Sequence, residues 1–132
     1  MNKIARIISV SFGAFAGIGG IEHGYFEWLQ GYTRPAGLMI SSIGAPCVPE
    51  TVWHACEPAM TILPNFRITG IVAFILGIAT IFYSLTVVRK GSGGVVLILL
   101  SLALLLMGGG IVPPVIGVVG GVFAIFGRSG LR

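Results

Sequence analysis

Long apolar runs dominate the chain, and they do not show the spacing of amphipathic helices or strands. Four such runs, at residues 4–29, 67–88, 93–109 and 111–127, are separated by more polar segments. A helix that crosses a membrane needs about 20 mostly apolar residues, because the hydrocarbon core is about 30 Å thick. The pattern therefore predicts an all-α membrane protein in which four transmembrane helices form a single bundle domain.

The ends of the runs support this division. The first run begins with Lys3 and Arg6, as a secretory signal does, but it is too long for the apolar core of a signal, and we expect it to be retained. The third run is almost entirely Leu, Ile and Val, residues that favour insertion into a membrane. Three glycines at residues 108–110 then precede Pro113 and Pro114. Because proline is tolerated in the first turn of a helix, runs three and four are predicted to form a helical hairpin.

Composition and charge agree with a lipid environment and set an orientation. Hydrophobic residues make up 55% of the 132 residues and charged residues only 9%, whereas about a quarter of a soluble domain is charged. Most cations lie at three places that four spans would bring to one side, namely Lys3 and Arg6, Arg89 and Lys90, and Arg128 and Arg132. The opposite side holds Arg34 and Arg67 with Glu50 and Glu57. The positive-inside rule then puts both termini in the cytoplasm of a prokaryotic cell and residues 31–65 outside its plasma membrane. No basic stripe suited to nucleic acid is present.

Glycines recur at helical spacing in the first and fourth runs. They are Gly13, Gly17, Gly20 and Gly24 in the first run and Gly117 and Gly121 in the fourth. Small residues three or four apart let membrane helices approach closely, so we expect packing faces here, either within the bundle or between copies in a homo-oligomer or larger membrane complex. The alternative is that glycine is simply common in membrane helices.

The segment expected outside the membrane contains both cysteines, Cys47 and Cys56. Disulfides persist on that side, and a bridge between these two would close a short loop. Their spacing is not the Cys-x-x-Cys of a redox motif. A structural disulfide is the favoured interpretation, with unpaired thiols and redox or metal chemistry as alternatives.

Ionisable residues near the outer boundary form the only candidate site. Glu22, His23, Glu27 and Gln30 lie at the end of the first run, and His23, Glu27 and Gln30 share a helix face. Charged groups at membrane depth are costly, which makes them candidates for a ligand or proton site. The alternative is that they only hydrogen-bond the outer loop to the bundle. Two protein ligands do not complete a metal site, so none is predicted.

Further polar residues of the outer segment complete this candidate site, namely Glu57, Asn65 and Arg67. Arg67 is expected to neutralise Glu22 or Glu57, which would let a partly buried carboxylate stay charged.

Three strings resemble a group of small four-pass prokaryotic membrane proteins of uncharacterised activity. They are Gly-Ile-Glu-His-Gly at residues 20–24, followed by Glu27 and Gln30, then residues 57–65, Glu-Pro-Ala-Met-Thr-Ile-Leu-Pro-Asn, and residues 108–117, Gly-Gly-Gly-Ile-Val-Pro-Pro-Val-Ile-Gly. The size and four-span plan are also similar to DoxX-like proteins, some of which are associated with quinone-linked sulfur oxidation. The first resemblance implies no activity, and the second rests on shape alone.

Three functions are compatible with this sequence. The favoured one is a non-enzymatic subunit or binding module whose polar outer cap holds a small ligand or a partner. The first alternative is a proton-coupled carrier resembling the small multidrug transporters, and the second is a DoxX-like redox component using a quinone or haem. No cofactor is assigned. Enzymatic activity is not favoured, because neither a nucleophile–base pair nor a phosphate-binding loop is evident.

Overall fold

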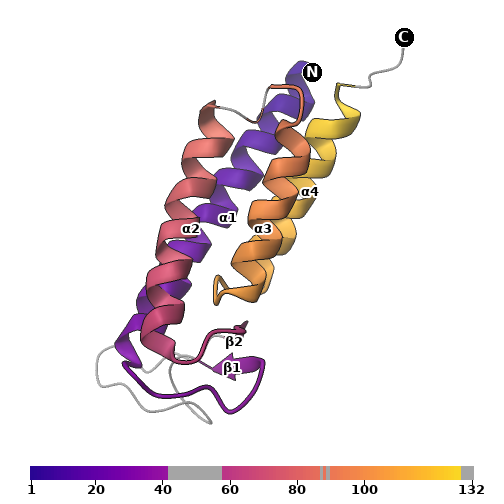
Figure 1. Ribbon diagram of the computed structural model, residues 1–132. Helices are drawn as coiled ribbons and strands as arrows, with labels where there is room; N and C mark the ends of the chain where they lie inside the picture. The colour runs from indigo at the N-terminus through magenta and orange to yellow at the C-terminus, as the bar shows by residue number, and fades with distance from the viewer. Residues whose placement is uncertain (42–57, 87, 89, 129–132) are drawn as a thin grey trace.

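The computed structural model describes residues 1–41, 58–86, 88 and 90–128. Four helices, α1 (Lys3–Leu29), α2 (Phe66–Thr86), α3 (Gly93–Leu106) and α4 (Val112–Phe126), run side by side (Figure 1). The prediction of a helical protein with four helices is confirmed. The N-terminus and the end of α4 lie together at what we call the terminal end of the bundle.

Two short strands at the opposite end were not predicted. β1 (Met39–Ser41) pairs antiparallel with β2 (Pro58–Met60), and we call this end of the bundle the strand end (Figure 1). The backbone N–H of Gly108, in the turn between α3 and α4, donates to the carbonyl of Met60 at 2.7 Å, and that of Ile62 donates to Leu106 at 3.1 Å. The segment between α1 and α2 and the α3–α4 hairpin are thus joined through their backbones.

Local sequence explains where the helices begin and end. The side chain of Asn2 accepts a hydrogen bond from the Ala5 N–H at 2.8 Å, which caps the start of α1. Gly31, at φ 67°, ends that helix in the left-handed conformation that glycine adopts without strain. Pro113 and Pro114 occupy the first turn of α4, as the sequence predicts. α3 and α4 have 14 and 15 residues and are shorter than expected.

Close backbone contact joins α1 to α2. A β-carbon added to Gly77 would lie 2.6 Å from the carbonyl oxygen of Gly17, and one added to Gly70 would lie 2.5 Å from that of Gly24. Both distances are shorter than any real carbon–oxygen contact, so only glycine fits at these crossings. The glycine face of α1 is therefore covered by α2 of the same chain.

The interior of the bundle combines small residues and a few apolar side chains such as Leu97 and Leu104 with buried hydroxyls. Ser9, Thr80, Ser84 and Ser101 are fully buried, and each donates its hydroxyl to the carbonyl four residues earlier, at distances of 2.6 to 2.8 Å. Large apolar side chains, by contrast, cover the exterior along the length of the helices. Examples are Phe15, Ile75, Phe82, Leu99 and Phe126, which are 49–69% exposed.

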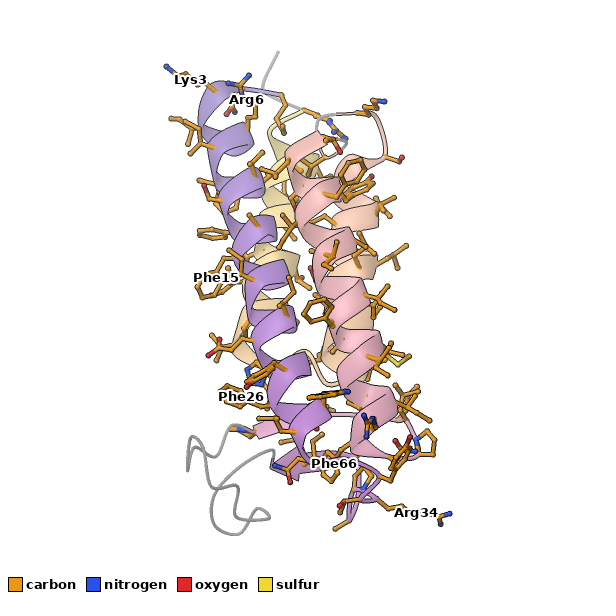
Figure 2. The ribbon with its side chains drawn as sticks, turned by 90° about the vertical axis from the view of Figure 1, so that its left-hand side faces the viewer. Lys3, Arg6, Phe15, Phe26, Arg34 and Phe66 are labelled. Atoms are coloured by element: carbon orange, nitrogen blue, oxygen red, sulfur yellow. The ribbon has the colours of Figure 1, made fainter. Side chains whose placement is uncertain are left out.

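Two of the helices, α1 and α2, have the length and apolar composition to cross a membrane. Only 39% of the most apolar stretch of α1 and 33% of that of α2 are buried. Figure 2 shows Lys3 and Arg6 at the terminal end, Arg34 at the strand end and Phe15 pointing outward between them.

The glycine crossing between α1 and α2 makes a prediction about stability. Gly77→Ala should lower the free energy of unfolding by about 1–3 kcal/mol, because the new methyl group meets backbone that cannot move aside cheaply. Unfolding of the purified protein in mild detergent measures this. Gly37→Ala is the matched control, since no atom lies within 4 Å of its added β-carbon. Equal stability of the two variants would contradict the packing described here.

Candidate functional site

The last turns of α1 place three polar side chains in the interior of the bundle. His23, Glu27 and Gln30, which we call the polar cluster, follow one another along one helix face, and Glu27 is 0% exposed. Neither carboxylate oxygen of Glu27 and neither amide atom of the Gln30 side chain has a hydrogen-bond partner among the described residues. Buried polar groups almost always have such partners, so this arrangement is unusual.

The turn between α3 and α4 covers the polar cluster. A β-carbon at Gly110 would lie 2.3 Å from Nε2 of His23, so the imidazole packs directly against that backbone. At the other end of the same turn, a β-carbon at Gly108 would lie 3.7 Å from Cγ of Glu27. Both glycines have positive φ angles, 85° for Gly108 and 79° for Gly110. The tight turn thereby reaches over both side chains.

Thr61 and Thr69 lie next to the α3–α4 turn that covers Glu27; sequence analysis placed Thr69 at the start of α2 without assigning it to the candidate site. The hydroxyls of Thr61 and Thr69 lie 3.0 Å apart and are both buried, and Thr69 also donates to the carbonyl of Asn65 at 2.9 Å. The methyl group of Thr69 lies against Gly108. These hydroxyls therefore form hydrogen bonds with each other and with Asn65, and neither of them bonds the carboxyl group of Glu27.

The structure does not bring Glu22 into the polar cluster. Its side chain is exposed and lines an open groove of about 270 Å³ together with His23, Pro58 and Val112. His23 therefore belongs to the buried polar cluster and also lines this groove.

Asn65 and Arg67 have neighbours other than the polar cluster. The side chain of Asn65 accepts from the Ile68 N–H at 2.9 Å and so caps the start of α2. The guanidinium of Arg67 lies over two aromatic rings, 5.1 Å from the centre of Trp28 and 5.2 Å from that of Tyr32. Arg67 thus stacks on aromatic rings, whereas Glu22 lines the groove beside Pro58.

Several candidate residues lie outside the described residues, namely Cys47, Cys56 and Glu57. The disulfide and an ion pair between Arg67 and Glu57 therefore stay predictions. Within the described ranges, no group of three or more His, Cys, Asp or Glu residues has the arrangement of a metal site.

The strings singled out in the sequence converge at this end of the molecule. The end of α1 and the segment from β2 to the start of α2 both contact the α3–α4 turn. Their separation along the chain hides this convergence, since helical spacing tells which residues share a face and not what covers that face.

The cap at Asn65 leads to a prediction that separates structure from ligand binding. Asn65→Ala should cost about 1 kcal/mol of stability through loss of the helix cap, while Asn65→Asp should cost little because aspartate caps equally well. Thermal unfolding of both variants in detergent tests this. If Asn65→Asp were as unstable as Asn65→Ala, capping would not be the role of Asn65.

Comparison with known proteins adds no relative. No family model, no curated protein and no solved structure matches the chain. A function for the chain is therefore inferred from the polar cluster and its surroundings.

Proposed function

We propose that this chain is a four-span integral membrane protein of the plasma membrane, with both termini in the cytoplasm, and that its polar cluster binds a small ligand from the outer side. In this proposal the protein is a binding module or subunit, not an enzyme. The membrane placement and the ligand site have separate support, and each has its own test.

The distribution of polarity supports the membrane placement. A soluble protein seldom exposes large continuous apolar surfaces, yet large apolar side chains cover the outside of all four helices, as Phe15, Phe82, Leu99 and Phe126 illustrate. Small residues in the interior, and hydroxyls that donate to a carbonyl of their own helix, are typical of helices that pack in lipid. Lipid as the surrounding solvent explains both observations.

The placement of the cations supports the orientation. Among the described residues, Lys3, Arg6, Lys90 and Arg128 belong to the terminal end of the bundle, and Arg34 and Arg67 to the strand end. Under the positive-inside rule the terminal end is cytoplasmic.

The short helices α3 and α4 are compatible with spanning. At about 1.5 Å per residue each covers roughly 21–23 Å, so the connecting turns must lie close to the hydrocarbon region. Backbone groups there need partners within the protein. At the terminal end, the guanidinium of Arg128 donates to the carbonyls of Val88 and Gly91. At the strand end, the backbone N–H groups of Gly108 and Ile62 donate to the carbonyls of Met60 and Leu106.

The buried carboxyl group of Glu27 is the observation on which the ligand site rests. A buried polar group without a hydrogen bond carries a substantial free-energy cost, and a carboxylate carries more. A ligand that brings positive charge or hydrogen-bond donors would remove this cost. Gln30, which can both donate and accept, would add specificity beside it. We therefore expect a small cation or amine rather than an anion.

This geometry changes which glutamate a proton-coupled carrier would use. A proton-coupled carrier needs a carboxyl group shielded from water, and of the two glutamates of α1 only Glu27 is buried. A carrier mechanism would therefore use Glu27 in place of Glu22.

The topology is tested with reporter fusions in a bacterial host. Green fluorescent protein fused to either terminus should fluoresce, because it folds in the cytoplasm and not when exported in unfolded form. Alkaline phosphatase inserted after Gly37 should be active, because it needs an oxidising compartment. Termini that report from opposite sides of the membrane would refute the four-span arrangement.

The ligand site is tested with Glu27→Gln, which keeps the shape of the side chain and removes its acid. Thermal unfolding in mild detergent is followed with sodium, magnesium or methylammonium chloride as probes. At a ligand concentration of 100 times Kd, the wild-type protein should gain about 2.7 kcal/mol, and Glu27→Gln should lose that gain. Glu22→Gln is the control, because Glu22 is exposed on the same helix and at the same end.

Two outcomes count against the ligand site. Stabilisation of wild type and Glu27→Gln by the same amount would place the binding elsewhere. If Glu27→Gln is less stable than the wild type and no probe stabilises the wild type, the polar cluster is a structural link to the α3–α4 turn. Native mass spectrometry of the wild type from mild detergent then reports retained small molecules and subunit number together.

A further inference from the structure

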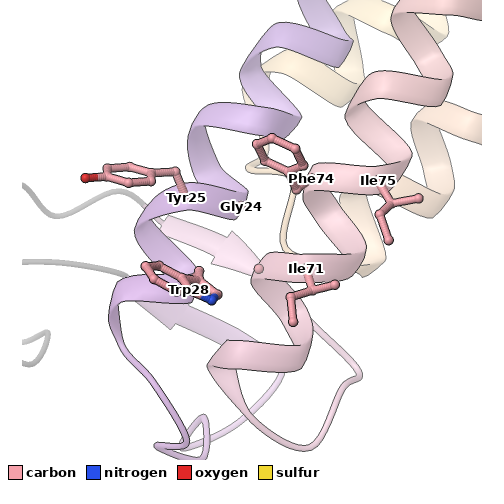
Figure 3. Close-up of a pocket in the computed structure, with 7 residues that line it drawn as sticks. Gly24, Tyr25, Trp28, Ile71, Phe74 and Ile75 are labelled. Atoms are coloured by element: carbon pink, nitrogen blue, oxygen red, sulfur yellow. The ribbon is translucent and has the colours of Figure 1, made fainter.

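A second groove lies on the outside of the bundle, between α1 and α2 at the strand end (Figure 3). Gly24 and Gly70 belong to it, at the point where the two backbones touch and no side chain fills the space between them. Tyr25 and Trp28 line it from α1, and Phe74 lines it from α2. The remaining lining residues are Ile71 and Ile75. Among the residues that the structure describes, no charged side chain lines the groove itself.

The size and surface of the groove suit a hydrocarbon chain. Its volume is about 260 Å³, which is below the usual range of about 300–1,000 Å³ for pockets that bind drug-sized molecules. It is open along one side, and its walls are partly exposed, with Trp28 and Tyr25 each 43% exposed. In a membrane these surfaces face lipid, so an acyl chain can enter from the side.

A cation lies next to the groove, on one of its wall residues. Arg67 stacks on Trp28, which is itself a wall of the groove, and on Tyr32 beyond it. Stacking uses the faces of the planar guanidinium and leaves N–H groups at its edge able to bind a phosphate with two parallel hydrogen bonds. Trp28 and Tyr32 also belong to the residue types that favour the headgroup level. In the membrane placement proposed above, these rings therefore favour a position of Arg67 near the phosphates of the outer leaflet.

We propose that this groove binds an anionic phospholipid of the outer leaflet, with one acyl chain between α1 and α2 and the phosphate on Arg67. The proposal rests on the membrane placement argued above and is independent of the ligand of the polar cluster. Charge complementarity selects the occupant: a zwitterionic lipid offers the same chain but adds a positive group that Arg67 repels.

Quenching of Trp28 fluorescence by brominated lipid tests the proposal. The chain has two tryptophans, so Trp53→Phe leaves Trp28 as the sole probe. The protein is reconstituted into vesicles made of equal parts phosphatidylglycerol and phosphatidylcholine, in which one lipid or the other carries bromine on its acyl chains. Bromine on phosphatidylglycerol should quench Trp28 more strongly, with a preference of up to about five-fold for one arginine near anionic lipid.

Variants of two arginines provide the controls. Arg67→Gln should remove the preference and Arg67→Lys should keep part of it, since lysine retains the charge without the planar donor edge. Arg34→Gln removes the same charge from the same end of the molecule and should keep the full preference. Circular dichroism checks that each variant keeps its helices.

Other results would overturn the proposal in distinguishable ways. Equal quenching by the two brominated lipids, or a preference that survives in Arg67→Gln, would rule out a phosphate site at Arg67. Weak quenching by both lipids that rises as protein is diluted with lipid would indicate a second copy of the chain in the groove. No quenching at any protein-to-lipid ratio would refute the membrane placement itself, whereas the stability tests on Glu27 would stand on their own result.

Discussion

Backbone contact between α1 and α2 is the constraint from which the rest of the molecule follows. Where glycines meet at Gly17 with Gly77 and Gly24 with Gly70, the two helices are fixed in rotation as well as distance. Successive residues of a helix point about 100° apart. Because Gly24 faces α2, its neighbours in the sequence point to either side of that contact. His23 and Glu27 are turned toward the α3–α4 turn, and Tyr25 and Trp28 toward the outside. One packing face thus sets both proposed sites.

The two sites use opposite chemistry at the same level of the bundle. On the inner side, a buried carboxyl group without a hydrogen-bond partner among the described residues lies under the α3–α4 turn. On the outer side, aromatic rings hold a guanidinium beside an apolar channel. Water-facing proteins rarely place such groups so near a continuous apolar surface. In the proposed membrane placement, both sites would lie at the boundary of the bilayer, where apolar and polar surroundings meet within a few ångströms.

Periodicity and glycine spacing predicted the four helices, their approximate ends and the shared face of His23, Glu27 and Gln30. These features depend on residues close together in sequence, and helical geometry converts their spacing directly into position. The pairing of β1 with β2, the cover of the α3–α4 turn over Glu27 and the stacking of Arg67 on Trp28 were not predicted. Each joins segments far apart along the chain. Electrostatic reasoning favoured a carboxylate for Arg67 and overlooked the aromatic rings at the end of α1.

The covering turn also has a consequence for biosynthesis. Glu27 leaves the ribosome early, but the backbone that covers it, at residues 108–110, is made about eighty residues later, and the hydrogen bond from Gly108 to Met60 of β2 cannot form until then. During synthesis the acidic side chain therefore lacks this cover until the α3–α4 turn has been made. A chain that ended after α2 would therefore lack the backbone that covers the carboxyl group of Glu27, so burial of this acid depends on the last two helices of the chain.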